Sequence, residues 1–295
     1  MTHESNLTKW IPHVLLMGFA LACIVPFLLL IISSVTSEDS IVRNGYSYFP
    51  EQLSLTAYEY LWSHWNELGR AYGITIFITV VGTVTSLAIT SMLAYPMSRT
   101  DMPLRNFWAF LVFFTLLFNG GLVPTYLIYT LVFDIKNTIW ALLIPGLLMN
   151  GFNVLLVRTF FITSIPPALV EAASIDGAGE IKIFYKIVLP LSMPIMATIG
   201  LFEAILYWND WFNGLTYVTD PSLFSIQNIL NRIISDIQFL SNNSSLASSA
   251  NETMAELPST SVRMAIAVVG VLPLLIAYPF FQKYFIKGIT IGAVK

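Results

Sequence analysis

Three shortages in this sequence of 295 residues each exclude a class of protein. Its single cysteine, Cys23, excludes a disulfide framework and a thiolate metal cluster. The three histidines, His3, His13 and His64, are too scattered to predict a metal site or a Ser-His-Asp triad. Charged residues make up only 11% of the chain and the net charge is −3, so the charge balance does not indicate a nucleic-acid partner.

Nucleotide-binding motifs are also missing. The sequence contains no GxxxxGK[ST] phosphate loop, and no GxGxxG that follows a strand. We therefore expect no nucleotide cofactor in this chain. If the function of this chain depends on ATP and Mg, a separate subunit should bind them.

Apolar residues are what the sequence has in abundance. Hydrophobic residues make up 56% of it and the mean hydropathy is +0.73, which is too apolar for a soluble domain of this length. A membrane-spanning helix needs about 20 mostly apolar residues. Six segments meet this requirement, approximately residues 10–32, 71–95, 107–133, 139–161, 194–217 and 262–285. The sequence predicts an all-α membrane protein with six transmembrane helices, divided into an N-terminal anchor with an outer loop (1–69) and a five-helix core (70–295).

The basic residues orient the predicted helices. The first apolar segment is longer than a secretory signal core and lacks a small-residue cleavage site after it, so we interpret it as a retained anchor. If the N-terminus is cytoplasmic, Lys9, Arg99, Arg105, Arg158, Lys182, Lys186, Lys283, Lys287 and Lys295 fall on the cytoplasmic side. The outer side then holds Arg43, Arg70, Lys136, Arg232 and Arg263. This excess of basic residues inside favours a cytoplasmic N-terminus and C-terminus.

Two outer segments have features of their own. Residues 34–69 combine acidic side chains with aromatic ones such as Trp62 and Trp65, which are typical of the membrane interface. Apolar residues recur at helical spacing over residues 226–240, which predicts an amphipathic helix along the outer membrane surface. The Ser- and Asn-rich residues 241–261 predict a mobile loop.

The fifth apolar segment carries acidic residues at membrane depth. Four residues spaced at i, i+4, i+7 and i+11 share one face of a continuous helix: Glu203, Tyr207, Asp210 and Gly214. A carboxylate at this depth costs about 2.5–3.5 kcal/mol on insertion scales, so the stripe should face a water-filled cavity or a partner. Together with Trp208 and Asn213 it suits a sugar, whose hydroxyls accept hydrogen bonds and whose ring faces stack on aromatic side chains. Interhelical hydrogen bonds to a second subunit are the alternative.

Three asparagines are weaker candidates for the same pathway. Asn150 and Asn153 lie on the fourth apolar segment, and contact with sugar and helix packing explain them equally well. Asn119 precedes a pair of glycines, so a break in the helix explains it as well as a sugar contact does.

A polar stretch between the fourth and fifth apolar segments has the most specific spacing in the chain. Residues 171–194 read EAASIDGAGEIKIFYKIVLPLSMP. The Glu171-Ala172-Ala173 triplet is followed after three residues by Gly177, and nine residues later by Ile187.

This stretch predicts two short helices joined by a turn. We expect Ser164 to cap a helix that opens with the two prolines at 166 and 167. Asp176 and Gly177 predict a turn in which the glycine adopts a positive φ. A second helix should begin near Glu180 and end at Pro190.

The spacing resembles the EAA signature of the membrane subunits of bacterial ABC importers, the loop through which a permease contacts its ATPase. FNGGLVPTYL (118–127), RTFFITSIP (158–166), YWNDWFN (207–213) and FFQKYFIKGITIGAVK (280–295) also look like the carbohydrate-uptake branch of that family. Within this branch the chain resembles the maltose-type second permease subunit, in the aldouronate or complex-oligosaccharide group.

This resemblance implies an oligosaccharide permease in a bacterial cell membrane. Its partners would be a homologous second permease, two ATPase subunits that bind ATP and Mg, and an extracellular solute-binding protein. The EAA loop would occupy about residues 162–193. The residues implied in ATPase coupling are Glu171, Ala172, Ala173, Asp176 and Gly177, together with the cytoplasmic tail from Lys287 to Lys295.

Other classes of protein remain as alternatives. An ion-coupled secondary transporter would use Glu203 and Asp210 as proton or cation sites. However, the six segments show no inverted repeat, and the EAA spacing would then be unexplained. A membrane-embedded enzyme is a more distant alternative, because only these two carboxylates offer it a catalytic constellation.

Overall fold

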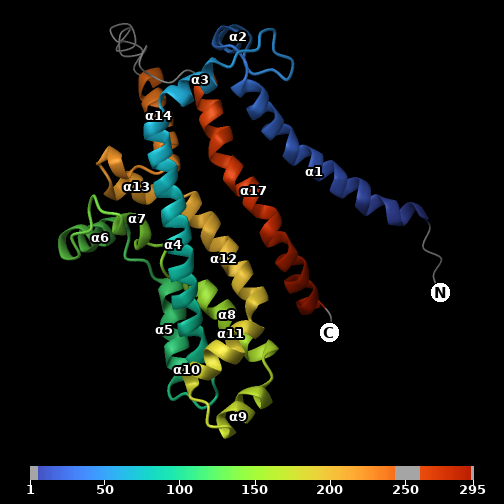
Figure 1. Cartoon of the computed structure of the whole chain (residues 1–295), viewed down its shortest axis with the longest axis vertical. Helices are drawn as coiled ribbons and strands as arrows, with labels where there is room; N and C mark the ends of the chain where they lie inside the picture. The colour runs from blue at the N-terminus through green and yellow to red at the C-terminus, as the bar shows by residue number, and fades with distance from the viewer. Residues whose placement is uncertain (1–5, 243–259, 294–295) are drawn as a thin grey trace. The chain divides into compact units, whose positions relative to one another are not determined.

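The computed structural model describes residues 6–242 and 260–293, which are mostly helical (Figure 1). The chain divides into two compact units. The first comprises Met1–Leu68 and Leu230–Pro273, and the second comprises Gly69–Ile229 and Leu274–Lys295. The division into an N-terminal anchor (1–69) and a five-helix core (70–295) stays a prediction.

Apolar helices dominate the described residues, as the composition predicts. Two unbroken helices, α1 (Asn6–Ser34) and α4 (Trp65–Ser98), are long and apolar enough to cross a membrane. Three further pairs of helices meet this criterion only if each bent pair counts as one span. The beginning of α17 (Thr260–Ala293) is also apolar, over Thr260–Ile276. The first, second and sixth predicted segments therefore coincide with single helices.

The first unit contains α1, α2 (Glu38–Asn44), α3 (Thr56–Ser63) and the beginning of α17. The apolar part of α1 is unburied in this chain. Ala57 and Leu61 of α3 pack against Val262, Ala265 and Ile266 of α17.

A carboxylate fixes the start of α17 within this unit. The Glu38 carboxylate accepts hydrogen bonds from the backbone N–H groups of Thr260 and Ser261, at 2.8 and 2.9 Å. Partial burial acts to raise the pKa of Glu38, but the hydrogen bonds from Ser261 and Thr260 outweigh it and hold this pKa below its usual value. Because the first N–H groups of a helix lack intrahelical partners, Glu38 acts as a cap from 222 residues away in sequence.

The second unit packs around two apolar clusters. One cluster joins Ile78 of α4 to α7 (Trp140–Leu143) and α13 (Phe212–Tyr217). The other joins the end of α4 to α8 (Gly151–Ser164), α9 (Pro167–Ile175) and α12 (Met193–Trp208). Figure 1 shows α9 and α10 (Glu180–Ile183) at the opposite end of this unit from α13.

The third predicted segment is interrupted at the glycine pair after Asn119, where the sequence predicts a break, and the fourth is wrong as a continuous helix. The third breaks between α5 (Arg105–Leu117) and α6 (Leu122–Leu127), where the chain bends by 111° and Gly121 has a φ of 85°. α6 continues into η1 (Ile128–Val132), a short π-helix. The fourth breaks between α7 and α8, where Pro145 lacks an N–H and Gly146 has a φ of 72°. In both cases the glycine adopts a conformation that a helix excludes.

The fifth predicted segment is also interrupted. α12 ends at Trp208, and α13 begins only at Phe212. Asp210 and Gly214 therefore do not continue the helical stripe of Glu203 and Tyr207, and the predicted single face is wrong.

The amphipathic helix predicted over residues 226–240 is present as α14 (Ile226–Asn242). It follows η3 (Pro221–Leu223), a turn of 3-10 helix. Its position along the outer membrane surface stays a prediction. The loop predicted over residues 241–261 lies largely outside the described residues.

Candidate coupling loop and polar cavity

The EAA residues lie on α9, a short helix that is almost entirely exposed. Val170 is its only buried residue, and it packs into the apolar cluster formed by α4, α8 and α12. Glu171, Ala172 and Asp176 are exposed, and the side chain of Ile175 is 86% exposed. The chain bends by 79° between α8 and α9. α9 thus presents Glu171, Ala172 and the apolar side chain of Ile175 outward. The buried Val170 and the half-buried Ala173 hold it against the cluster.

A glycine turn closes α9 in the way that the sequence predicts. Gly177 has a φ of +77°, and its N–H donates to the carbonyl of Ser174 at 3.0 Å. The N–H of Ala178 donates to the carbonyl of Ala173, also at 3.0 Å. These two bonds form a Schellman motif, which satisfies the last carbonyls of the helix. The turn fixes where α9 ends and sends the chain back toward α10.

The predicted ends of the two short helices need correction. Ser164 is the last residue of α8, and Pro166 occupies the N-cap of α9 without a side-chain hydrogen bond. Pro190 does not end the second helix. α10 continues through a π-helix, η2 (Phe184–Val188), into α11 (Leu189–Leu191), and Ser192 follows. Pro190 lies inside this continuous run, as the second residue after the π-helix.

A polar cluster joins Glu180, the first residue of α10, to the end of α4. The hydroxyl of Tyr95 donates to Oε2 of Glu180 at 2.5 Å. Nη2 of Arg99 lies 2.9 Å from Oδ2 of Asp101 and 3.4 Å from Oε1 of Glu180. The hydrogen bond from Arg99 holds the pKa of Asp101 below its usual value. Tyr95 and Arg99 are 85 and 81 residues away from Glu180 in the sequence, so no local periodicity predicts these contacts.

A second cationic side chain supports the end of α4. Nε of Arg158, on α8, donates to the carbonyl of Met97 at 2.9 Å. The last carbonyls of a helix lack intrahelical partners and carry partial negative charge, so a guanidinium there is stabilising. α8, which leads into α9, is therefore connected to α4 by a polar contact as well as by apolar packing.

Three of the predicted pathway residues meet at one cavity. Asn119, Asp210 and Asn213 line a space of about 420 Å³ together with Thr125 and Tyr217. The lining contains one carboxylate and no lysine or arginine. Each of the three residues also makes a side-chain hydrogen bond to the backbone of this chain. Oδ1 of Asn119 accepts from the N–H of Gly121, Oδ1 of Asp210 accepts from that of Asn213, and Nδ2 of Asn213 donates to the carbonyl of Pro145.

The other predicted pathway residues lie outside the lining of this cavity. Nδ2 of Asn153 donates to Oε1 of the fully buried Glu203 at 2.6 Å, which joins α8 to α12. The hydroxyl of the buried Tyr207 donates to the carbonyl of Leu143 at 2.9 Å. Trp208 is buried, and Oδ1 of Asn150 caps α8 by accepting from the N–H of Phe152. Asn153, Glu203 and Tyr207 thus join helices within this chain, which is the helix packing that the sequence left open for Asn153. The alternative contact of the acidic stripe with a second subunit stays a prediction.

Gly82 is a structural residue that sequence reasoning missed. A Cβ at this position would come within 2.4 Å of the Tyr207 ring. Glycine in the middle of an apolar helix is the signal that could have revealed this close approach. Of the implied tail contacts, Lys287 lies near the end of α17, where only the backbone is described, and Lys295 lies outside the described residues.

These features define a class of protein: a multi-pass helical membrane protein that extends an exposed helical loop from its bundle. The comparisons with known proteins identify the family. Residues 86–291 match the family described as "Binding-protein-dependent transport system inner membrane component". The chain belongs to this family, and it is the membrane-embedded permease subunit of an ABC importer rather than an enzyme.

Individual relatives agree with this assignment. The polygalacturonan/rhamnogalacturonan transport system permease protein YtcP of Bacillus subtilis is 37% identical over 280 residues, which cover 95% of both chains. Protein LplC of the same organism is 39% identical over 282 residues, covering 94% of this chain and 91% of the relative.

A solved structure extends the likeness to the fold. It is the crystal structure of a bacterial ABC transporter involved in the import of the acidic polysaccharide alginate, and the matched chain is 30% identical with a TM-score of 0.80. The match covers 97% of this chain and 100% of that one.

Proposed function

We propose that this permease carries oligosaccharides from an extracellular solute-binding protein to the cytoplasm by alternating access, driven by ATP hydrolysis in two partner ATPase subunits. A homologous second permease would complete the pathway. The names of the relatives support a sugar substrate, since that of YtcP concerns polygalacturonan and rhamnogalacturonan and the solved transporter imports alginate.

The observation that carries this proposal is the exposed helix α9. Its single buried residue joins it to a cluster that contains side chains of α4, α8 and α12. An ATPase that pulls on α9 would therefore move three bundle helices together, because packed interiors transmit displacement and do not absorb it. The excess of basic residues on one side supports a cytoplasmic position for this loop, where the ATPase would be.

The polar cavity is the proposed sugar contact in this chain. Amide and carboxylate groups of Asn119, Asp210 and Asn213 can pair with sugar hydroxyls, and Tyr217 offers an aromatic face. The second permease would supply the remaining contacts. We assign Glu203, Tyr207 and Asn153 to holding the helices that surround the pathway.

Reconstitution tests the proposal. The tagged chain should co-purify with a second permease and an ATPase, and the complex in liposomes should hydrolyse ATP faster when binding protein and oligosaccharide are added. A panel of acidic and neutral oligosaccharides of matched length would define the substrate. Hydrolysis that no oligosaccharide in the panel stimulates would contradict the sugar assignment, whereas a chain that purifies without an ATPase would contradict the coupling role of α9.

A further inference from the structure

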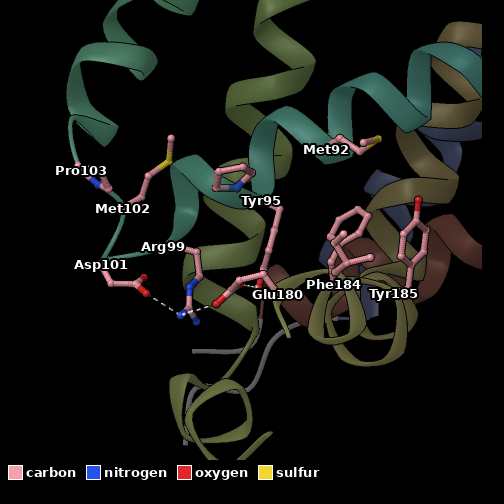
Figure 2. A pocket seen from close by; sticks show the side chains of 11 residues that line it. Met92, Tyr95, Arg99, Asp101, Met102, Pro103, Glu180, Phe184 and Tyr185 are labelled. Atoms are coloured by element: carbon pink, nitrogen blue, oxygen red, sulfur yellow. Dashed lines mark hydrogen bonds and ion pairs between the residues drawn. The ribbon is translucent and has the colours of Figure 1, made fainter. Parts of the chain in front are cut away.

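A second cavity, of about 580 Å³, opens beside the end of α4. It lies between the last turns of α4, the loop that leads to α5, and the segment formed by α10 and η2 (Figure 2). Met92, Pro96, Phe184 and Tyr185 form apolar walls. Neither the proposed sugar contacts nor the EAA residues of α9 line this cavity.

Three charged residues form one rim of the cavity. Figure 2 shows Arg99 between Asp101 and Glu180, and the two carboxylates are more than half exposed. One guanidinium and two carboxylates give the rim a formal charge of −1. Both ion pairs use Nη2 of Arg99, so its Nε and Nη1 protons are available to a further acceptor.

The apolar walls and the charged rim of the cavity lie at different levels along α4. Met92 and Pro96 belong to the last two turns of this membrane-crossing helix, which ends at Ser98. Arg99 and Asp101 follow immediately. In a bilayer the walls would lie at the depth of the acyl chains and the rim at the depth of the headgroups. A molecule that fills the cavity must therefore combine an apolar part with a polar end.

We propose that this cavity binds one phospholipid with an ethanolamine headgroup. Its ammonium would donate to the carboxylates of Asp101 and Glu180, its phosphate would accept from Arg99, and an acyl chain would lie against Phe184 and Tyr185. This occupant offers a cation that the two carboxylates can share and an anion for the guanidinium. Phosphatidylglycerol carries no cation and would meet a rim of net negative charge. The methylated ammonium of phosphatidylcholine cannot donate hydrogen bonds to the carboxylates.

Native mass spectrometry of the purified importer complex tests the proposal. The complex would be equilibrated with equal amounts of phosphatidylethanolamine, phosphatidylcholine and phosphatidylglycerol with matched acyl chains. We expect retained phosphatidylethanolamine to exceed either competitor by about tenfold at this site, the difference that one charge-assisted hydrogen bond produces. Asp101→Asn combined with Glu180→Gln leaves Arg99 as the only charge, and this variant should retain phosphatidylglycerol instead.

Two further variants keep the test independent of protein folding. Met92→Trp fills the apolar part of the cavity without changing a charge, and it should remove the retained lipid. Asp134→Asn neutralises an exposed carboxylate outside the cavity at a left-handed position, φ 49°, which asparagine tolerates, so it should leave the lipid profile unchanged.

Two results would overturn the proposal. One is the same lipid profile in the unmodified complex and in the variant that lacks both carboxylates. The other is an efficient cross-link from Met102→Cys to the second permease, which would show that protein fills the cavity.

Discussion

At the scale of single residues, Gly177 and Tyr95 illustrate two ways in which a side chain sets the position of the coupling loop. Gly177 acts through the backbone, because its positive φ allows the two hydrogen bonds that close α9. Tyr95 acts through a contact between distant segments, because its hydroxyl binds Glu180 on the returning helix. The first could be predicted from the Asp-Gly dipeptide, whereas the second required the folded chain.

Gly177→Ala should impair coupling through backbone strain alone. Open space surrounds a Cβ at this position, but an alanine at φ +77° costs about 1–2 kcal/mol and would shift the end of α9. We expect normal membrane insertion and lowered sugar-stimulated ATP hydrolysis in the reconstituted complex.

Gly179→Ala is the matched control for this prediction. Gly179 lies two residues away, also in open space, but its φ is −69°, which alanine adopts without strain. Equal coupling in the two variants would show that the turn does not position α9.

At the scale of elements, contacts between helices far apart in the sequence decide where each helix begins and how it is held. Glu38 of α2 caps α17, and Asn153 of α8 binds Glu203 of α12. Hydrogen bonds between side chains of two membrane helices, such as Asn153–Glu203, contribute about 0.6 kcal/mol on average. They therefore specify which helices pair more than they stabilise the pair.

The cap on α17 predicts a dependence of stability on pH. Because the pKa of Glu38 is lower in the folded protein than its usual value, its contribution to stability is present above the unfolded pKa of about 4.5 and is lost as the pH falls through the folded value. Glu38→Gln should lower the Tm at pH 7, and the difference from the unmodified protein should shrink below about pH 4.5.

Asp39→Asn provides the control, because the neighbouring carboxylate of Asp39 lies outside the contact with Thr260 and Ser261. Thermal unfolding in detergent at pH 7 and at pH 4 measures the Tm of each variant. A difference in Tm that is the same at pH 7 and pH 4 would show that the charge of Glu38 does not contribute to the cap.

At the scale of the whole molecule, the energy source distinguishes the importer from an ion-coupled transporter. If ATP drives uptake, a protonophore should leave uptake unchanged while ATP is held constant. Uptake should stop when the partner ATPase loses its catalytic glutamate. Asp210→Asn should change the rate or affinity without removing a proton requirement, since none exists in this mechanism.

Uptake by proteoliposomes with ATP enclosed, with and without an ion gradient, measures this directly. In an ion-coupled transporter Asp210→Asn would abolish concentrative uptake but spare exchange, because the carboxylate would carry the driving ion. Concentrative uptake by this chain alone on an ion gradient, without ATP, would contradict the ATP-driven mechanism.

The sequence by itself determined the class of the protein, most of its helical segments and the turn at Gly177. These features depend on short-range physics. An apolar run of about 20 residues predicts a membrane helix wherever it occurs, and a glycine after a short helix predicts its end. The EAA spacing then predicted which loop would contact a partner.

Only the tertiary structure decided which polar side chains meet. Asn153 and Glu203 are 50 residues apart, and Tyr95 and Glu180 are 85 apart. No local periodicity encodes such pairs. The predicted stripe on the fifth segment failed because the chain leaves the helix at Trp208, which separates Asp210 from Glu203. A carboxylate inside a membrane protein must find a partner or a water-filled cavity, but the packing of the other helices determines which of the two it finds.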